Sequence, residues 1–263
     1  MGSEELQKQR AIDTHSLQAG EFAESYQELE QDAFRTCFTY SRRRLEQLLE
    51  RYLPARGDGL KLLDVGCGTG HHMASLRDRG FTVAGVDGSE GMLEHARTNN
   101  PGADIRHSDV EELPFASESF DFVICIEVLR YLPHLTRAVR EMGRVLKPGG
   151  VCLATAAPVL NLNGYYVINR VANMMPVGNL VRLKQFFTTS GRLSREFQEA
   201  GFEKPAIHGV YIGPVNWFEH LTPKALPALL KWWEPIDAQL ADRPVLREFA
   251  NMFLVRGVRR RRS

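Results

Sequence analysis

The stretch LLDVGCGTG, residues 62–70, decides the fold of this chain. Apolar residues and one acid lead into glycines at alternate positions, Gly66, Gly68 and Gly70. A strand that ends at the first glycine and turns through the others into a helix brings bare backbone and a helix N-terminus up to a ligand. The pattern suits a nucleotide-like cofactor. A tight strand-to-helix turn with no ligand is the alternative.

On the C-terminal side of this stretch, short apolar runs alternate with helical segments. The expected strands are residues 61–65, 82–87, 103–109, 120–127 and 150–158. The expected helices between them are residues 71–80, 89–100 and 135–150. Strand, helix, strand in strict order is typical of crossover units. The sequence therefore predicts an α/β fold with a parallel sheet covered on both faces.

The regions outside this alternation predict covers and further core elements. Amphipathic helices are expected at residues 19–30 and 32–54, ahead of the first strand. Residues 159–187 are predicted to be irregular, and the segment is too long for a connector and rich in Asn, aromatics and Met, which indicates a lid. The rest predicts, in order, a helix at 189–202, a strand at 206–213, a broken helix at 223–240 and a strand at 251–258. We interpret residues 1–263 as a single domain with an N-terminal cover at 1–58, a cofactor-binding core at 59–158, a lid insertion at 159–187 and a C-terminal part of the core at 188–263.

Composition excludes several classes of partner and site. The 263 residues carry a formal net charge of +1, which gives no electrostatic footprint for nucleic acid or an anionic membrane. The four cysteines match no metal-ligand or disulfide spacing, so we expect no metal and a reducing cytoplasm. No run approaches the ~20 apolar residues of a membrane span, and the polar start lacks a secretory signal. Nothing in the sequence indicates the oligomeric state.

A second acid narrows the choice of cofactor. Asp87 ends the strand that follows the glycines, where a carboxylate can accept both hydroxyl protons of a ribose. A dinucleotide site needs G-x-G-x-x-G, whose third glycine opens the helix beside the pyrophosphate. Here the spacing is G-x-G-x-G, and the dinucleotide position is His71. Together the glycines and Asp87 favour an adenosine cofactor other than a dinucleotide.

Five motifs in order carry a family resemblance. They are LLDVGCGTG, VAGVDGS, SDVEELPFASESFDFVIC, EVLRYLP and RVLKPGG. With these motifs the chain resembles the class I S-adenosylmethionine-dependent methyltransferases, in particular the small-molecule group that includes the ubiquinone and menaquinone enzymes. The resemblance is close over residues 60–150 and looser over 186–202. It implies a Rossmann-like, seven-stranded, mostly parallel sheet with helices on both faces, S-adenosylmethionine as cofactor and S-adenosylhomocysteine as product.

The resemblance also implies ten cofactor contacts. They are Tyr26, Asp64, Gly66, Gly68, Asp87, Gly88, Met92, Asp109, Val110 and Ile126. Gly66 and Gly68 would let the backbone pass under the methionine and ribose portions, and Asp64 would orient the amino group. The Ile126 carbonyl would meet the methionine ammonium, and Asp87 would hold the ribose hydroxyls.

The adenine contacts are implied in the same way. Gly88 and Met92 would border the ring, Asp109 would accept from its exocyclic amine, and the Val110 backbone would meet the neighbouring ring nitrogen. Tyr26 would place an aromatic ring from the N-terminal cover over the cofactor.

On the acceptor side the chain departs from the family pattern. Where relatives often read VLHHL, with histidines able to act as a base, this chain reads VLRYL with Arg130 and Tyr131. Arg130 would meet an anionic or polar group on the substrate, or else sit in a surface ion pair. Tyr131, with Tyr165 and Tyr166 from the lid, completes the predicted substrate-binding set. We assign no general base, since His134, His208, His220, Tyr131 and Tyr211 each have only single-residue signals.

The function expected is methyl transfer to a small molecule through an O-, N- or C-nucleophile. A natural product, a quinone or a glycolipid is the acceptor class, with apolar or lipid-linked acceptors favoured by the lid composition. The arginine-rich tail, residues 255–263, is either a solvated segment or a weak membrane-surface contact. Other hypotheses are a nucleic-acid methyltransferase, a catalytically silent scaffold and an aminopropyl transferase. The chain lacks the NPPY-type motif of nucleic-acid methyltransferases. The intact glycines and acids count against a silent scaffold, and Arg130 counts against an aminopropyl transferase.

Overall fold

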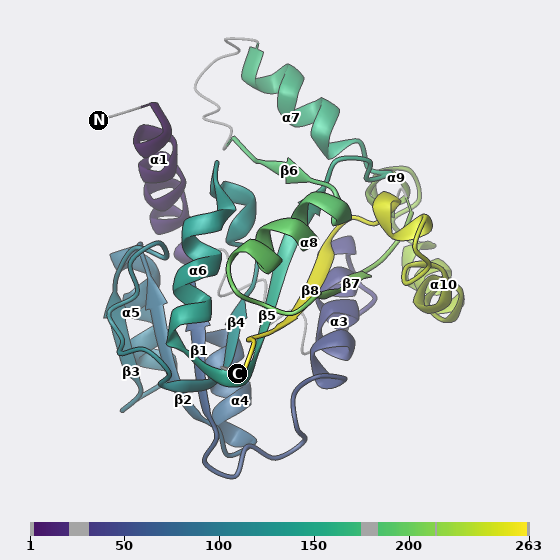
Figure 1. The fold of residues 1–263 in the computed structure, drawn as a ribbon. Coiled ribbons are helices and arrows are strands. Elements are labelled where there is room, and N and C mark those ends of the chain that lie inside the picture. The colour runs from purple at the N-terminus through teal and green to yellow at the C-terminus, as the bar shows by residue number, and fades with distance from the viewer. Residues whose placement is uncertain (1–2, 21–31, 175–183, 214, 262–263) are drawn as a thin grey trace.

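One sheet organises the part of the chain that the computed structural model describes, residues 3–20, 32–174, 184–213 and 215–261. Its strands run in the order β3-β2-β1-β4-β5-β8-β7, and a two-residue strand, β6, pairs with β5 off this path (Figure 1). The strands are β1 (Lys61–Val65), β2 (Thr82–Asp87), β3 (Asp104–His107), β4 (Phe120–Cys125), β5 (Leu146–Pro158), β6 (Phe187–Thr188), β7 (Ala206–Gly209) and β8 (Phe253–Val258). Strands β1 to β5 are parallel to one another, whereas β8 is antiparallel to both β5 and β7. The predicted mostly parallel α/β fold is confirmed.

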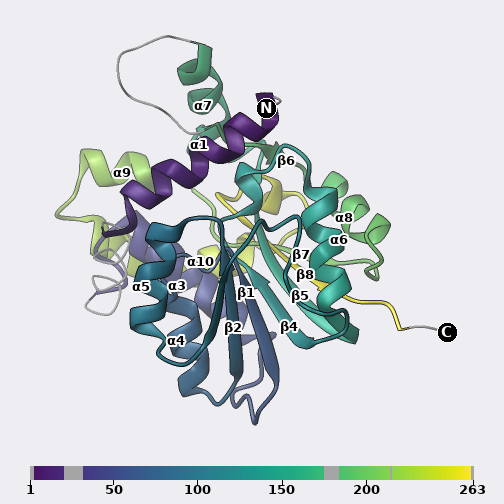
Figure 2. The same ribbon diagram turned by 90° about the vertical axis from the view of Figure 1, so that its left-hand side faces the viewer.

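Helices cover the sheet on both faces (Figure 2). The helices are α1 (Ser3–Leu17), α3 (Cys37–Glu50), α4 (His71–Asp78), α5 (Glu90–Asn99), α6 (Leu135–Val145), α7 (Tyr165–Met174), α8 (Ser190–Glu199), α9 (Val215–Leu221) and α10 (Leu226–Leu240), with short 3-10 turns η1 (Leu129–Tyr131) and η2 (Leu246–Phe249). Successive side chains of a strand point to opposite faces, so Leu62 and Leu63 of β1 enter different cores. Leu62 packs with residues of α3, α4, α5 and α10, and Leu63 with residues of α6 and α8. Both leucines are fully buried, as a parallel sheet requires.

The parallel strands bring distant parts of the sequence to one edge. Strands β1, β2, β3 and β4 are adjacent in the sheet and run in the same direction. Their carboxyl ends, at Val65, Asp87, His107 and Cys125, therefore lie along the same edge. Ligands of open α/β sheets bind at such an edge.

Several sequence predictions differ from the structure. Helices α1 and α9 were not predicted, and most of the helix expected at 19–30 lies outside the described residues. The helix expected at 135–150 ends at Val145, and residues 146–150 belong to β5 instead. The segment 159–187, predicted as irregular, contains α7. The strand predicted over 206–213 stops at Gly209.

A further difference is α10, which was expected to be broken and is one helix through Pro235. Beyond the proline, Asp237 is fully buried and accepts hydrogen bonds from the Tyr40 hydroxyl and the Ile212 amide, both at 2.6 Å. These bonds tie the C-terminal half of the helix to α3 and to the segment after β7. This anchoring offsets the backbone hydrogen bond that proline removes. Within the described part of the chain, no helix has the length and apolarity needed to cross a membrane.

Candidate active site

The glycine loop between β1 and α4 forms the floor of the site. Gly66, Gly68 and Gly70 have φ values of 73°, 53° and 79°, in the left-handed region that favours glycine. At Gly66 a Cβ would also lie 2.1 Å from Cγ2 of Val128, whereas at Gly68 the space is open to the Met92 sulfur at 4.0 Å. The loop therefore needs glycine at Gly66 both for its backbone conformation and for its close approach to Val128.

This double requirement predicts a large loss of stability on substitution. Gly66→Ala is expected to lower the free energy of unfolding by about 3 kcal/mol or more, through backbone strain and overpacking. The matched control is Gly102→Ala, where φ is 80° but a Cβ would meet no described atom within 4 Å. That variant is expected to lose only about 1 to 2 kcal/mol. Equal losses in urea unfolding would show that the approach to Val128 is not what requires glycine.

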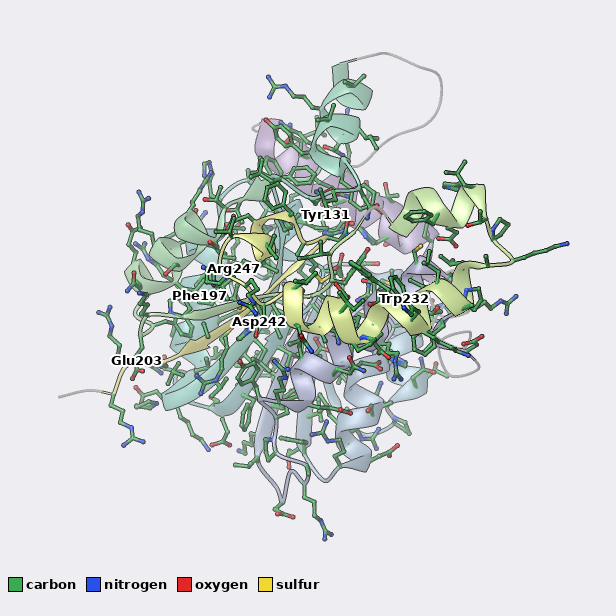
Figure 3. The ribbon with its side chains drawn as sticks, turned by 90° about the vertical axis from the view of Figure 1, so that its right-hand side faces the viewer. Tyr131, Phe197, Glu203, Trp232, Asp242 and Arg247 are labelled. Atoms are coloured by element: carbon green, nitrogen blue, oxygen red, sulfur yellow. The ribbon has the colours of Figure 1, made fainter. Side chains whose placement is uncertain are left out.

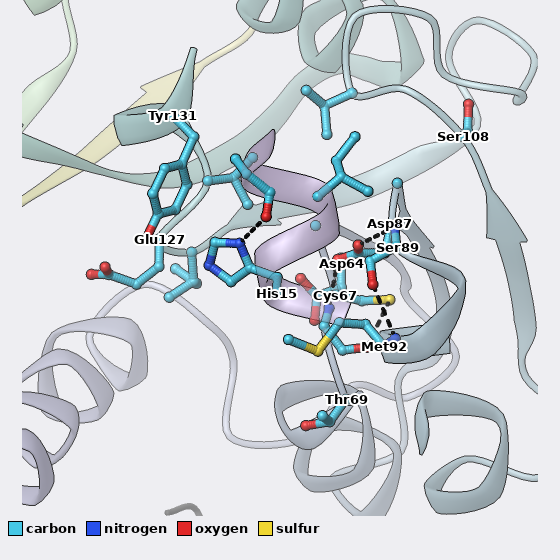
Figure 4. A pocket seen from close by; sticks show the side chains of 18 of the residues that line it. His15, Asp64, Cys67, Thr69, Asp87, Ser89, Met92, Ser108, Glu127 and Tyr131 are labelled. Atoms are coloured by element: carbon cyan, nitrogen blue, oxygen red, sulfur yellow. Dashed lines mark hydrogen bonds between the residues drawn. The ribbon is translucent and has the colours of Figure 1, made fainter. Parts of the chain in front are cut away.

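A cavity of about 210 Å³ opens above this loop at the carboxyl edge of the sheet (Figure 4). Ten of the residues predicted for the site line it. They are Asp64, Gly66, Gly68, Asp87, Gly88, Met92, Asp109, Val110, Ile126 and Tyr131. The structure therefore brings together residues from the ends of β1, β2 and β4, the segment after β3, and η1.

Three of the predicted residues that the structure describes, Arg130, Tyr165 and Tyr166, are not among those that line the cavity. Arg130 forms an ion pair with Glu127, with Nη1 2.8 Å from Oε2, and its contact with the substrate stays a prediction. The Tyr165 amide donates to Asn161, and the Tyr166 ring packs edge-on against Phe187. Tyr26 lies outside the described residues.

Asp87 is held in a fixed orientation by backbone amides. Its Oδ1 accepts from the Ser89 amide at 2.8 Å, and its Oδ2 accepts from the Gly68 amide at 2.9 Å. Burial raises the pKa of Asp87, while these two amides act in the opposite direction. A carboxylate has about four acceptor sites, so each oxygen can still accept one hydrogen bond from a ligand.

Asp64 lies below Asp87 with no compensating charge. Only 1% of its surface is exposed, and its Oδ2 has no hydrogen-bond partner among the described residues. Burial, and next the neighbouring Asp87, raise the pKa of Asp64 to about 8. A ligand that brings positive charge to this end of the cavity would relieve both effects.

Asp109 joins the end of β3 to helix α1. Its Oδ1 accepts from the Glu111 amide at 2.8 Å, and its Oδ2 contacts the Lys8 ammonium. Lys8 also lies 2.8 Å from Glu111. An adenine amine that donates to Asp109, as predicted, would therefore bind the same carboxylate that the Lys8 ammonium contacts.

Helix α1 supplies a wall of the cavity that was not predicted. Lys8, Ala11, Ile12 and His15 line it, and the Ser16 hydroxyl lies 2.6 Å from that of Ser89. The helix is largely polar, so no apolar stripe marks it in the sequence. The N-terminal cover was expected over residues 1–58, and α1 lies inside that range, ahead of the two helices that were predicted for it.

Other polar cavity residues also escaped prediction. They are Arg42, His71, His72 and Glu127. Burial lowers the pKa of His72 to about 3, with His71 and Arg42 adding to the effect, so His72 is neutral at physiological pH. Glu127 directly follows Ile126, so its position beside a predicted residue was a signal that could have found it.

The histidines considered from the sequence lie elsewhere. His208 on β7 contacts Asp242 through Nδ1 and the Tyr52 hydroxyl through Nε2, each at 2.5 Å. Figure 3 shows Asp242, the partner of His208, apart from Tyr131, which lines the cavity. His134 and His220 are not among the residues that line the cavity. Tyr211 is buried and does not line it either.

Comparison with known proteins decides the family. Residues 63–154 match the methyltransferase domain family. The chain is 37% identical over 164 residues to the demethylmenaquinone methyltransferase of Staphylococcus aureus strain JH9, an alignment that covers 55% of this chain and 68% of that protein. The chain belongs to the S-adenosylmethionine-dependent methyltransferases. This confirms the resemblance inferred from the five motifs.

Two further comparisons show how much of the related proteins this chain covers and which fold it shares with a solved structure. The chain is 38% identical over 160 residues to the biotin biosynthesis bifunctional protein BioHC of Cellvibrio japonicus, an alignment that covers 60% of this chain and 30% of that protein. The chain thus spans less than half the length of the first curated relatives it matches. A methyltransferase structure from Thermotoga maritima shares the fold with a TM-score of 0.60 at 18% identity, covering 93% of this chain and 98% of that one.

The cavity of this methyltransferase fits the cofactor of its family. S-adenosylmethionine carries a sulfonium and an ammonium, and the buried Asp64 and the half-buried Asp87 place two carboxyl groups in one cavity. The remaining acceptor sites of Asp87 suit the two hydroxyls of a ribose. The glycine loop leaves backbone, without side chains, facing the same space.

Proposed function

We propose that this protein transfers a methyl group from S-adenosylmethionine to a small-molecule acceptor. The observation that carries the proposal is the pair of acids Asp64, which is buried, and Asp87, which is half-buried, in a cavity beside the glycine loop at the carboxyl edge of the sheet. When bound, the cofactor supplies an activated methyl group on a sulfonium. The protein contributes positioning and exclusion of water, which can provide much of the acceleration of such a displacement.

The named relatives support a small-molecule acceptor. One methylates a menaquinone precursor, and another belongs to biotin biosynthesis, according to their names. For this chain we propose an acceptor with an apolar part. Exposed apolar side chains gather between β5 and the end of the described part of α7: Leu160, Leu162, Val167, Ile168 and Val171. These residues lie in the segment 159–187, whose role as a lid stays a prediction.

Two measurements test the proposal. Isothermal titration calorimetry should show S-adenosylmethionine binding to the isolated chain with one site. A mass-spectrometric screen of phenols, alcohols, amines and quinols, each incubated with enzyme and cofactor, should show a product heavier by one CH₂. Binding without any methylated product across the screen would favour the scaffold hypothesis, and an absence of binding would contradict the proposal itself.

A further inference from the structure

Glu127 has an unusual backbone conformation at the edge of the cavity. Among the described residues, Asp58, Glu118 and Glu127 are the non-glycine residues with positive φ, and Glu127 has a φ of 65°. Of these three, only Glu127 lines the cavity. Its amide donates to the Thr155 hydroxyl at 2.7 Å, which holds the strained conformation against β5. Strain that the surroundings maintain at a cavity wall points to a role for the side chain.

The two oxygens of the Glu127 carboxylate differ in their partners. Oε2 lies 2.8 Å from Nη1 of Arg130. Oε1 is buried, and no described residue donates a hydrogen bond to it. A buried carboxylate oxygen without a donor is unfavourable, so a ligand that brings an O–H or N–H would be stabilised there.

Glu127 lies away from the groups that fit the cofactor. Figure 4 shows it beside Tyr131, at the other end of the view from Asp87 and Met92. The cavity therefore has a pair of acids at one end and a separate acid at the other. The first end fits the cofactor, which leaves Glu127 on the side open to an acceptor.

The charged and titratable groups around Glu127 come from several parts of the fold. They include Arg130 and Tyr131 of η1, Tyr165 of α7, Tyr211 after β7, and His15 of α1, whose ring centroid lies 4.9 Å from that of Tyr131. Burial raises the pKa of each of these tyrosines, and the charge of Glu127 acts in the same direction. The phenols are therefore protonated at neutral pH, and Glu127 is the carboxylate that they and Arg130 surround.

We propose that Glu127 accepts a hydrogen bond from the nucleophilic O–H or N–H of the acceptor and takes its proton during methyl transfer. This inference rests on the function proposed above and deepens it. The acceptor's lone pair forms a bond to the methyl carbon, and the carbon–sulfur bond breaks with its electron pair going to sulfur. The proton moves from the acceptor oxygen or nitrogen to Oε1 of Glu127, which releases it to water after the product leaves. The acceptor class is therefore an alcohol, phenol or amine, methylated at oxygen or nitrogen.

The first test compares the wild type with Glu127→Gln and Glu127→Asp. The probes are S-adenosylmethionine with a simple phenol, a primary alcohol, a primary amine and a 1,3-diketone as carbon nucleophile. We expect O- or N-methylation by the wild type. Glu127→Gln should bind the cofactor within about threefold of wild type, but transfer methyl roughly 100-fold more slowly and lose the acidic limb of the pH–rate profile. Glu127→Asp, which keeps the carboxylate, should recover part of the rate.

Each contrary result has a distinct meaning. A wild-type rate in Glu127→Gln would overturn this inference and leave the proposed function standing, as would wild-type methylation at carbon. A tenfold loss of cofactor affinity in Glu127→Gln would place this residue in the cofactor site instead. A wild type that binds the cofactor but methylates none of the probes would overturn both proposals.

The second test needs no acceptor. Glu127→Gly relieves the positive φ and the unpaired oxygen, so its thermal midpoint should rise by roughly 2 to 4 °C. The matched control is Glu118→Gly at φ 60°, a residue that does not line the cavity. Both variants lose an ion pair, Glu127 with Arg130 at 2.8 Å and Glu118 with Arg259 at 3.2 Å. Of the two residues, Glu127 is the one with a buried oxygen that no described residue donates to, so the gain of Glu118→Gly should be smaller, and its methyl transfer should equal that of wild type. A lower midpoint for Glu127→Gly would show that Glu127 is present for stability, which would overturn the inference.

Discussion

Asp87→Ala is expected to weaken S-adenosylmethionine binding at least tenfold. The substitution removes two acceptor oxygens from the cavity, and each charge-assisted hydrogen bond to a ligand contributes roughly 1.5 to 3 kcal/mol. It also releases the Gly68 and Ser89 amides, which Asp87 holds at 2.9 Å and 2.8 Å, so the glycine loop loses its fixed position. Calorimetric titration of both proteins with the cofactor measures the change.

Asp104→Ala is a matched control for the loss of charge. Asp104 begins β3, is exposed, and pairs with Arg106 at 2.7 Å away from the cavity. This variant should bind the cofactor like wild type. Equal affinity of Asp87→Ala and Asp104→Ala would remove Asp87 from the cofactor site.

The affinity for S-adenosylmethionine is also expected to rise steeply with pH. With its pKa raised to about 8, Asp64 is mostly protonated in the free protein at pH 6, whereas a cationic ligand favours the ionised carboxylate. Binding must then include the cost of removing that proton, up to about 1.4 kcal/mol per pH unit below the pKa. We expect affinity to increase by up to about 100-fold between pH 6 and pH 8.

The variant Asp64→Asn shows how much of the pH dependence of cofactor affinity comes from Asp64 and how much from other titratable groups. The variant keeps the shape of the side chain and lacks the titrating group, so its affinity at pH 8 should be much weaker than that of wild type and should change little from pH 6 to 8. A wild-type affinity that is flat over this range would contradict a protonated Asp64.

The raised pKa of Asp64 also makes the free energy of unfolding depend on pH. The folded state of Asp64 titrates near pH 8, far above the usual value of 3.8, so it binds more protons than the unfolded state between about pH 4 and 8. Its contribution to the free energy of unfolding therefore falls as pH rises through that window. Without ligand, Asp64→Asn should be more stable than wild type at pH 8, and urea unfolding at pH 5 and pH 8 should show the gap widening.

Local patterns predicted the core of the site. The glycines at 66, 68 and 70 and the acids that close β1 and β2 are constrained by their neighbours in sequence, so their positions could be read directly. The parallel order of the strands then placed Asp64, Asp87 and Ile126 at one edge. The glycine loop and the acids follow from residues close together in sequence, and their placement at one edge follows from the parallel order of the strands.

The cover and the acceptor side depend on contacts between distant residues. Lys8 acquires its role from Asp109, 101 positions away, and nothing in the composition of α1 indicates that pairing. Two roles were left open for Arg130, a substrate contact or an ion pair, and the sequence did not indicate that Glu127, three residues before it, is its partner. Sequence patterns show which side chains are polar, whereas the choice among several possible ion-pair partners is made by the tertiary structure.

The cavity walls come from the ends of neighbouring strands in a continuous parallel ladder, in which Leu63 pairs with Ala84 of β2 and Val123 of β4. No single strand or hairpin contains the site, so it exists only when residues far apart in the chain have assembled. An unfolded chain then has no affinity for the cofactor, and binding stabilises the whole sheet by mass action. At a cofactor concentration of 100 times Kd this amounts to about 2.7 kcal/mol, spread over elements that never touch the ligand.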